Sequence, residues 1–503
     1  MRGLATRLGW PDDWYSTRGT AVTRSERLVL AIAVLASFVA FLDGSVINVA
    51  LPAITAELGG GLSLQQWVVD AYLITLGSLM LLAGSMSDVF GRILVLRLGL
   101  IGFGITSLLC ALAPSGEFLI VARALQGVSG ALLVPSSLAL ILSTFRGPAQ
   151  GTAIGLWTAW TSAAFLVGPV LGGLFVDLAS WRLVFAINVL PILVTLWLLA
   201  LLGERDERMR EVPIDYLGAI LGVIGLGLPV FALIEQATYG LASPIIWVPL
   251  AIGVLAFGGF IVRQRVAPAP MMPLGLFRVR NFAVGNVATV LIYGALSLGT
   301  FVLAVFLQES AGYSATLAGA ALLPVTVVNI ALSPLFGSLA GRFGPRLFMT
   351  VGPILGGVGF LLLLRIDASA DYLTAVLPGI AVFGLGLTIT VAPLTAAVLG
   401  SISSRQAGIG SAVNNALARI AGLIAIALLG VIVGSELDLE GFHRGLVVTA
   451  VLLMIGGVVS AIGIRNVPAE DTAAGSGEQA RAGGGQENDI HERRGDDQLE
   501  EKT

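Results

Sequence analysis

Fourteen apolar segments, each about as long as a membrane is thick, alternate with short polar loops along the chain. Roughly 20 apolar residues in a helix cross a hydrocarbon layer of about 30 Å. The pattern predicts an all-α polytopic membrane protein, and the even number of crossings predicts that both chain ends lie on one side. The predicted spans are residues 28–52, 67–86, 93–113, 118–142, 152–176, 183–202, 217–235, 244–262, 282–306, 317–340, 347–364, 375–399, 409–433 and 445–464.

Arginines are sorted unequally between the two sets of loops. Outside the last 35 residues, 19 of them fall in the N-terminal segment and in every second loop, whereas the opposite loops hold only Arg182, Arg365 and Arg444. Cytoplasmic loops carry an excess of arginine and lysine. We therefore expect a multi-pass protein of the plasma or inner membrane with both termini in the cytoplasm. An error of one span would scramble this sorting, so the charges support the count independently.

The composition argues against a soluble domain and against metal chemistry. Only 12% of the residues are charged, compared with about 25% in soluble proteins. The end of the chain, residues 469–503, holds ten acids and four bases and is expected to be disordered. Cys110, His443 and His491 are too few and too scattered for a metal cluster. We expect no metal and no cofactor, with a proton gradient as the energy source.

A short motif recurs in the two halves of the chain. Residues 84–92 (GSMSDVFGR) and 337–345 (GSLAGRFGP) share four residues at an offset of 253, and spans 1 and 9 start 254 residues apart. Duplicated halves around a central site are typical of alternating-access transporters. The predicted order is a cytoplasmic segment 1–27, a six-helix half 28–202, two inserted helices 203–262, a cytoplasmic loop 263–281, a second six-helix half 282–465 and a cytoplasmic tail 466–503.

Four segments together follow the pattern of one family. They are residues 41–52 (FLDGSVINVALP), 84–92, 123–127 (RALQG) and 168–173 (GPVLGG). In this order and spacing the chain closely resembles the fourteen-helix drug:proton antiporter branch of the major facilitator superfamily. The resemblance covers residues 25–465 and implies the major facilitator fold. The chain departs from the family's pattern at four positions, Ile93, Ser129, Ala164 and Gly341.

Charged side chains inside a membrane are costly and are therefore candidates for function. Asp43 lies 15 residues into span 1, and Asp70 and Arg123 enter their spans from the opposite side, so all three should share one layer. Burial favours a neutral carboxyl group and a nearby arginine favours the carboxylate. We predict that Asp43 or Asp70 is the proton-coupling site, with Arg123 as its partner. The resemblance also implies roles for Asp43 and Arg123, and a static pair that fixes helix packing is the alternative.

The turn after span 2 is a candidate gating loop, formed by Gly84, Asp88, Gly91 and Arg92. Asp88 and Arg92 are four residues apart and can pair locally or bridge to a neighbouring helix end. The resemblance implies that this loop latches the outward-open state. The alternative is a solvated turn that only keeps a positive charge in the cytoplasm.

Span 5 contains a candidate antiporter motif made of Gly168, Pro169, Gly172 and Gly173. Glycines four residues apart let helix backbones approach closely in lipid, and proline bends the helix. The resemblance associates this motif with exporters rather than importers. Ordinary tight packing is the alternative.

The middle of the membrane is the default position for a substrate pocket. Spans 9–12 carry no deep acid, and Arg419 near the middle of span 13 would favour anionic or zwitterionic substrates. An amide inside a membrane more often makes a hydrogen bond between helices. The candidate pocket residues are Asn48, Gln126, Trp157, Trp160, Asn329, Asn414, Asn415 and Arg419.

These features predict a proton-coupled exporter of small amphipathic organic compounds such as drugs or antibiotics, acting as a monomer in the lipid bilayer by alternating access. One alternative is a dedicated exporter of an endogenous metabolite or lipid. Others are a passive facilitator, which would not depend on a pH gradient, and a nutrient importer. The sequence holds no nucleophile–histidine pair and no phosphate-binding loop, so we expect neither an enzyme nor a nucleic-acid partner.

Overall fold

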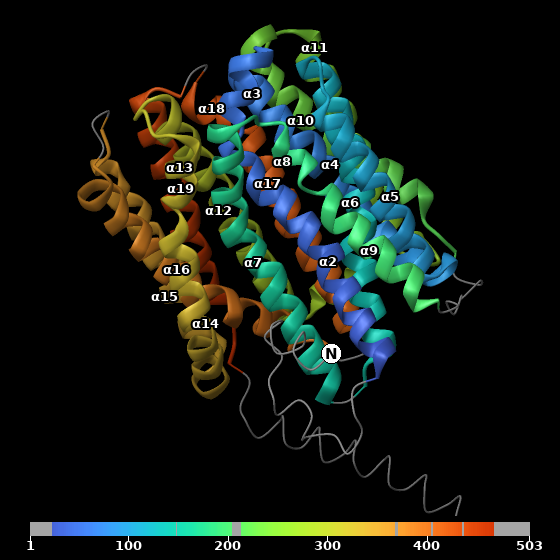
Figure 1. Cartoon of the computed structure of the whole chain (residues 1–503). Helices are drawn as coiled ribbons and strands as arrows, with labels where there is room; N and C mark the ends of the chain where they lie inside the picture. Colours follow the sequence, from blue (N-terminus) through green and yellow to red (C-terminus); the bar gives the residue numbers. More distant parts are fainter. Residues whose placement is uncertain are drawn as a thin grey trace, which may run out of the picture.

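The computed structural model describes residues 23–146, 148–203, 213–367, 371–403, 406–434 and 437–466. Figure 1 shows long helices that run between two sides of the molecule. Thirteen helices in the described part are long and apolar enough to cross a membrane. The predicted cytoplasmic segment before Thr23 and the predicted tail after Asn466 lie outside the described residues.

Each of the fourteen predicted spans overlaps a helix. The predicted fifth span falls within the 31-residue helix α7, in addition to the thirteen candidate crossings. The helices, including short 3-10 turns and the π-helical turn η5, are α2 (Arg24–Val46), η2 (Ile47–Val49), α3 (Leu51–Leu58), α4 (Gly61–Phe90), α5 (Arg92–Ala111), α6 (Gly116–Thr144), α7 (Pro148–Leu178), α8 (Leu183–Ala186), α9 (Val189–Leu202), α10 (Tyr216–Tyr239), α11 (Pro244–Val266), η3 (Leu274–Arg278), α12 (Arg280–Glu309), α13 (Ala315–Ala320), α14 (Leu323–Phe343), α15 (Pro345–Leu362), η4 (Leu363–Arg365), η5 (Tyr372–Val376), α16 (Leu377–Leu399), α17 (Ala407–Ala427), α18 (Leu429–Val433) and α19 (Leu439–Gly463).

Local sequence signals account for where several helices begin and end. The hydroxyl of Thr23 accepts a hydrogen bond from the backbone of Glu26, whose carboxylate accepts from the backbone of Thr23, so this capping box starts α2. The α4–α5 turn is made at Gly91 (φ 100°) and the α14–α15 turn at Gly344 (φ 83°). A left-handed backbone favours glycine at both positions. They are 253 residues apart, the offset of the repeated motif.

The same helix pairs pack together in both halves of the chain. In the first half, α2 packs on α7 and α9, and α6 packs on α4 and α5; in the second half, α12 packs on α17 and α19, and α16 packs on α14 and α15. Each pair in the second half lies eight predicted spans after its counterpart. The two six-helix halves and the two inserted helices of the predicted fold are therefore confirmed.

The inserted helices form a hairpin beside the seam between the halves. α10 packs against α11 and α4, and more lightly against α17 and α18. Asp215 caps α10 and accepts a hydrogen bond from Nε of Arg263 on α11 at 2.9 Å. Although burial acts in the opposite direction, hydrogen bonds from Arg263 and from the backbone of Gly218 lower the pKa of Asp215. α11 exposes large apolar side chains such as Leu255, as expected for a helix that faces lipid.

Both described chain ends lie on one side of the molecule, which we call the terminal side. Eight helical crossings separate the start of α2 from the start of α12, so both helices start on the same side. The Nε of Arg280, at the start of α12, donates to the carbonyl of Gly463, at the end of α19. The terminal side is the lower side of Figure 1, where α2 begins. The other side is called the opposite side below.

Candidate functional site

A buried ion pair joins α2 to α6 inside the first half. Nη1 of Arg123 lies 2.6 Å from Oδ2 of Asp43, and both side chains are about 1% exposed. The Nε of Arg123 also donates to the carbonyl of Val68 on α4 at 2.9 Å. The guanidinium carbon lies 4.3 Å from the centre of the Tyr72 ring, within reach of a cation–π interaction. The predicted pairing of Asp43 with Arg123 is therefore present.

Two amides complete the surroundings of the Asp43 carboxylate. Nε2 of Gln126 on α6 and Nδ2 of Asn188 each donate to Oδ1 of Asp43 at 3.0 Å. Gln126 also accepts from Nη1 of Arg123 at 2.7 Å and donates to the hydroxyl of Ser107 on α5 at 2.9 Å. We call Asp43, Arg123, Gln126, Asn188 and Ser107 the charge cluster. Both carboxylate oxygens of Asp43 accept hydrogen bonds, which is the condition under which a buried charge is tolerated, whereas Oδ1 of Asn188 has no partner within the described residues.

Asn188 and Ser107 were absent from the candidate residues predicted from the sequence. Asn188 lies between α8, which ends at Ala186, and α9, which starts at Val189. It belongs to the segment WRLVFAIN, residues 181–188, which the family resemblance includes. That segment was the only available signal, because an uncharged side chain in a membrane helix does not stand out.

Asp70 does not join the charge cluster, although it lies on α4 between Val68 and Tyr72, which both contact Arg123. The shared layer of the three charges stays a prediction. Its side chain is fully buried, and neither carboxyl oxygen has a hydrogen-bond partner within the described residues. On the same face of α4, Nε2 of Gln66 donates to the carbonyl of Ile426 at 2.6 Å, and Gly77 faces Ile420. The Asp70 side of α4 therefore faces α17 of the second half rather than α6.

The gating residues form a partly exposed helix junction in which Gly91 is buried. α4 continues through Asp88 to Phe90, so the turn is shorter than predicted and is made at Gly91. The carboxylate of Asp88 lies 3.8 Å from Nη2 of Arg92, and the two side chains are 42% and 29% exposed. A methyl group at Gly84 would meet no neighbouring atom. In this conformation the ion pair of Asp88 and Arg92 is local and does not reach the second half.

The glycines of α7 lie in close helix contacts. Added methyl groups at Gly168 and Gly172 would collide with Ser45 and Val46 of α2, whereas one at Gly173 would collide with the backbone of Ala315 and Thr316 at α13. The carbonyl of Pro169 lies against Gly319 in the same way. Gly168 and Gly172 therefore pack α7 against α2 of its own half, and Pro169 and Gly173 pack it against α13 of the second half.

The two halves are closed against each other on the opposite side. Asp177, at the end of α7, accepts hydrogen bonds from the backbone N–H groups of Ala315 at 3.0 Å and Thr316 at 2.8 Å. Nε2 of Gln65 donates to Glu309 at 2.7 Å. Gln66 also donates to backbone carbonyls at the end of α17, and these hydrogen bonds between the halves of the described chain all lie at this end.

The terminal-side ends of the facing helices are open by comparison. Added methyl groups at Gly151 and Gly155 of α7 would meet nothing, and Trp160 is 41% exposed. In α14, Ala340 alone is counted as buried. The described structure is therefore an arrangement that is closed on the opposite side and open toward the terminal side.

Most of the predicted pocket amides already have partners within the protein. The Nε1 of Trp157 donates to Ser37, the Nδ2 of Asn414 donates to Asn286 and Thr289, and the Nδ2 of Asn415 donates to the carbonyl of Ser411. Gln126 belongs to the charge cluster and is fully buried. The remaining candidates Asn48, Trp160, Asn329 and Arg419 are partly or largely exposed.

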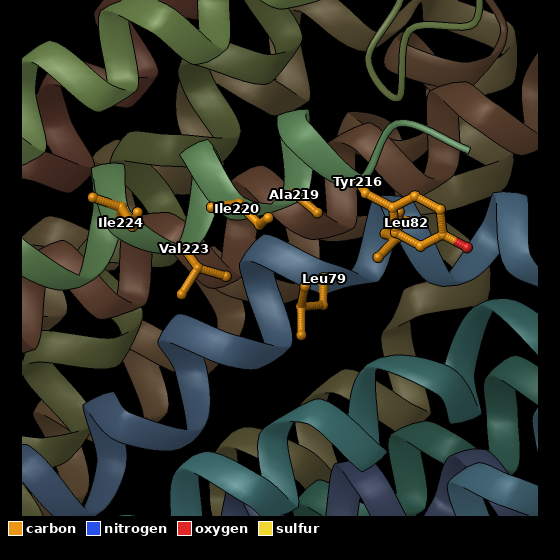
Figure 2. A pocket seen from close by; sticks show the side chains of 7 residues that line it. All are labelled: Leu79, Leu82, Tyr216, Ala219, Ile220, Val223 and Ile224. Carbon is orange, nitrogen blue, oxygen red and sulfur yellow. The ribbon is translucent and has the colours of Figure 1, made fainter. Parts of the chain in front are cut away.

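Two further features lie apart from the charge cluster. An apolar cavity of about 300 Å³ lies between α4 and α10, as Figure 2 shows; it is lined by Leu79, Leu82, Tyr216, Ala219, Ile220, Val223 and Ile224.

On the opposite side, Glu57 accepts hydrogen bonds from Nη1 of Arg182 and from Nε1 of Trp181, both at 2.7 Å. These hydrogen bonds lower the pKa of Glu57. The described residues hold no group of three or more potential metal ligands of the His, Cys, Asp or Glu type.

Two repeated halves around a seam, with a buried ion pair in one of them, define a polytopic transporter-like membrane protein. The family model described as Major Facilitator Superfamily matches residues 33–426 and 286–485. The chain belongs to the major facilitator superfamily.

Curated relatives and a solved structure extend this likeness. The chain is 35% identical to the methylenomycin A resistance protein of Bacillus subtilis over 83% of this chain and 89% of the relative. It is 32% identical to the tetracenomycin C resistance and export protein of Streptomyces glaucescens over 81% of this chain and 76% of the relative. A POT family transporter crystallised with a thioalcohol-conjugated peptide has a TM-score of 0.65 at 14% identity, covering 86% of this chain and 95% of that one. This last likeness concerns the fold alone.

Proposed function

We propose that this protein is a proton-coupled exporter of small amphipathic organic compounds, including antibiotics, that works by alternating access. The observation that carries the proposal is the Asp43–Arg123 pair, buried in the membrane-spanning part of a member of this transporter superfamily. The names of relatives that confer resistance to, or export, methylenomycin A and tetracenomycin C support organic antibiotics as the substrate class. The sorted arginines support a plasma or inner membrane location with both termini in the cytoplasm.

The coupling step follows from competition for one carboxylate. In the described conformation Asp43 is occupied by Arg123, Gln126 and Asn188, an arrangement that suits the ionised form. A proton that reaches Asp43 removes its charge and releases Arg123 from the pair. The two protonation states therefore have different preferred packings, which is the differential interaction that a population shift requires. Proton release toward the terminal side would restore the pair and leave the transporter ready to take up substrate there.

Asp70 is the second candidate for the proton site, and a different observation favours it. Its fully buried carboxyl group has no partner within the described residues, and it faces the moving seam between α4 and α17. An unpartnered buried carboxyl group is stable only when it is neutral. Opening of the seam on the opposite side would give Asp70 water and the opportunity to lose its proton.

Dye efflux from liposomes with and without an imposed pH gradient tests the proposal. We expect gradient-driven efflux by the wild type, its loss in Asp43→Asn, and its retention in Asp70→Asn. Loss in Asp70→Asn with retention in Asp43→Asn would move the coupling site to Asp70. Asp215→Asn, outside the seam, is the matched control for removing one carboxylate from a helix of the bundle.

The alternatives make distinct predictions in the same assay. A passive facilitator would release dye at a rate that does not depend on the gradient. A dedicated exporter of an endogenous metabolite or lipid would show counterflow with that compound and none with unrelated dyes. If no tested compound moves under a gradient of either polarity, the proposal of proton-coupled drug export fails.

A further inference from the structure

Arg419 is a cation in the membrane-spanning part of the second half that has no acidic partner. It lies on α17, twelve residues after the helix start at Ala407 and eight before its end at Ala427. None of the ion pairs among the described residues includes it, and its side chain is only half-buried. Arg123, by contrast, is fully buried and paired with Asp43. An unpaired arginine at this depth costs several kcal/mol, so its presence calls for a compensating contact.

The side chain of Arg419 crosses the seam between the two halves. Its Cβ lies 3.8 Å from the position that a Cβ would occupy at Gly77 of α4, so its base rests on the first half. Its guanidinium carbon lies 5.1 Å from the centre of the Phe41 ring on α2, and Nη1 lies 3.8 Å from a Cβ built at Gly44. Two glycines of the first half thus leave room for an arginine from the second half.

This geometry leaves the guanidinium between the two halves in a side chain that is only partly buried. A cation over an aromatic ring keeps its N–H groups at the edge free to donate in the plane of the guanidinium. The fork of N–H groups matches a carboxylate with two parallel hydrogen bonds. Phe41 adds an apolar surface beside the charge, which suits an amphipathic ligand.

The acids of the chain near this position are not available to Arg419 in the described conformation. Asp43 is occupied by Arg123 and two amides. Asp70 is on the face of α4 that packs on α17, but its carboxyl oxygens have no partner in the described residues, Arg419 included. The aromatic hydroxyls of Tyr72 and Tyr293 are the other titratable groups whose surroundings include Arg419. Within the described residues no acid supplies a counter-charge to Arg419, so an anionic ligand can supply one.

We propose that Arg419 and Phe41 form a carboxylate-binding subsite in the substrate path, so that the exported compounds include amphipathic organic acids and zwitterions. This inference rests on the proposed export function, because it names the substrate class of the same pathway. The charged head of the ligand pairs with Arg419 and its apolar body packs on Phe41.

Equilibrium binding of matched fluorescent probes tests the subsite without requiring transport. The probes are dansylglycine, its neutral methyl ester and ethidium, each titrated into purified protein in detergent. For the wild type we expect dansylglycine to bind at least tenfold more tightly than its ester, because a hydrogen bond to a charged group contributes about 1.5–3 kcal/mol. In Arg419→Gln this ratio should fall to about 1, and in Arg419→Lys it should be intermediate because the charge remains without the fork. A general loss of binding cancels in the ratio.

Arg342→Gln is the control variant, because Arg342 is an exposed arginine at the terminal-side end of α14, whereas Arg419 lies near the middle of α17. It should keep the wild-type ratio. Equal binding of acid and ester by the wild type, or an unchanged ratio in Arg419→Gln, would overturn the subsite. The same probes in the liposome assay separate the two proposals. Acid-selective binding without gradient-driven transport would support the carboxylate-binding subsite and reject proton-coupled export.

Discussion

Replacing Asp43 and Asp70 with asparagine, one at a time, should distinguish the two buried acids by their cost to stability. Asp43 accepts hydrogen bonds from three donors, and an asparagine in its place turns an N–H group toward at least one of them. It also leaves the Arg123 guanidinium buried without a counter-charge. Asp70 has no hydrogen-bond partner in the described chain, so the amide of the same shape removes no contact.

The magnitudes follow from the contacts. Breaking a buried ion pair by removing one partner costs about 3–5 kcal/mol, because the remaining charge stays buried and uncompensated. Arg123 keeps its bonds to Val68 and Gln126 and its position over Tyr72, so the cost of Asp43→Asn should lie near the lower end, about 3 kcal/mol. Asp70→Asn exchanges one unpartnered neutral group for another and should change stability by about 1 kcal/mol or less.

Thermal unfolding of the purified variants at one scan rate checks this order. Asp43→Asn should lower the unfolding midpoint clearly, and Asp70→Asn should not. The double variant Asp43→Asn with Arg123→Gln removes both charges and should recover much of the loss, which a double-mutant cycle measures as coupling. The reasoning is refuted if Asp70→Asn destabilises as much as Asp43→Asn, or if the double variant is as unstable as the sum of its parts.

Three further predictions concern the two ends of the molecule. Asp88→Ala should change stability by less than about 1 kcal/mol, because the ion pair with Arg92 is partly exposed. It should nevertheless raise maleimide labelling of a Gly155→Cys variant from the terminal side, where the buried Cys110 gives little background. Unchanged labelling would reject the latch. Gly173→Ala should slow dye efflux because its methyl group strains the contact with α13 by about 1–3 kcal/mol, whereas Gly155→Ala, which meets nothing, should transport at the wild-type rate. Because hydrogen bonds lower the pKa of Glu57, its contribution to stability is complete above its ordinary pKa and is lost as pH falls through the lowered value. Glu57→Gln should therefore flatten the fall in stability at acidic pH. An unchanged fall would contradict the stabilising role of the Glu57 hydrogen bonds.

The sequence allowed the helices and the main ion pair to be predicted, because both depend on rare and costly features. Long apolar runs and sorted arginines leave few alternatives for the fold, and a buried Asp43 requires a partner such as Arg123. The position of Asp70 could not be obtained in this way. Depth in the membrane follows from counting residues, but the face of a helix that meets a particular neighbour depends on how the helices rotate and pack. For the same reason the amide of Asn188 was missed, since its role exists only once α9 lies beside α2.

The closure on the opposite side is built in a way that allows it to open. Its contacts include close approaches of backbone at Gly173 and Gly319, together with hydrogen bonds that the N–H groups at the start of α13 donate to Asp177. N–H groups at a helix start and an exposed carboxylate are readily hydrated when the contact separates, so opening leaves no charge stranded in lipid. The charge cluster behaves in the opposite way, because all of its members lie within one half and stay together when the halves move. In the coupling that we propose, a proton on Asp43 would bias this movement without taking part in the contact that opens.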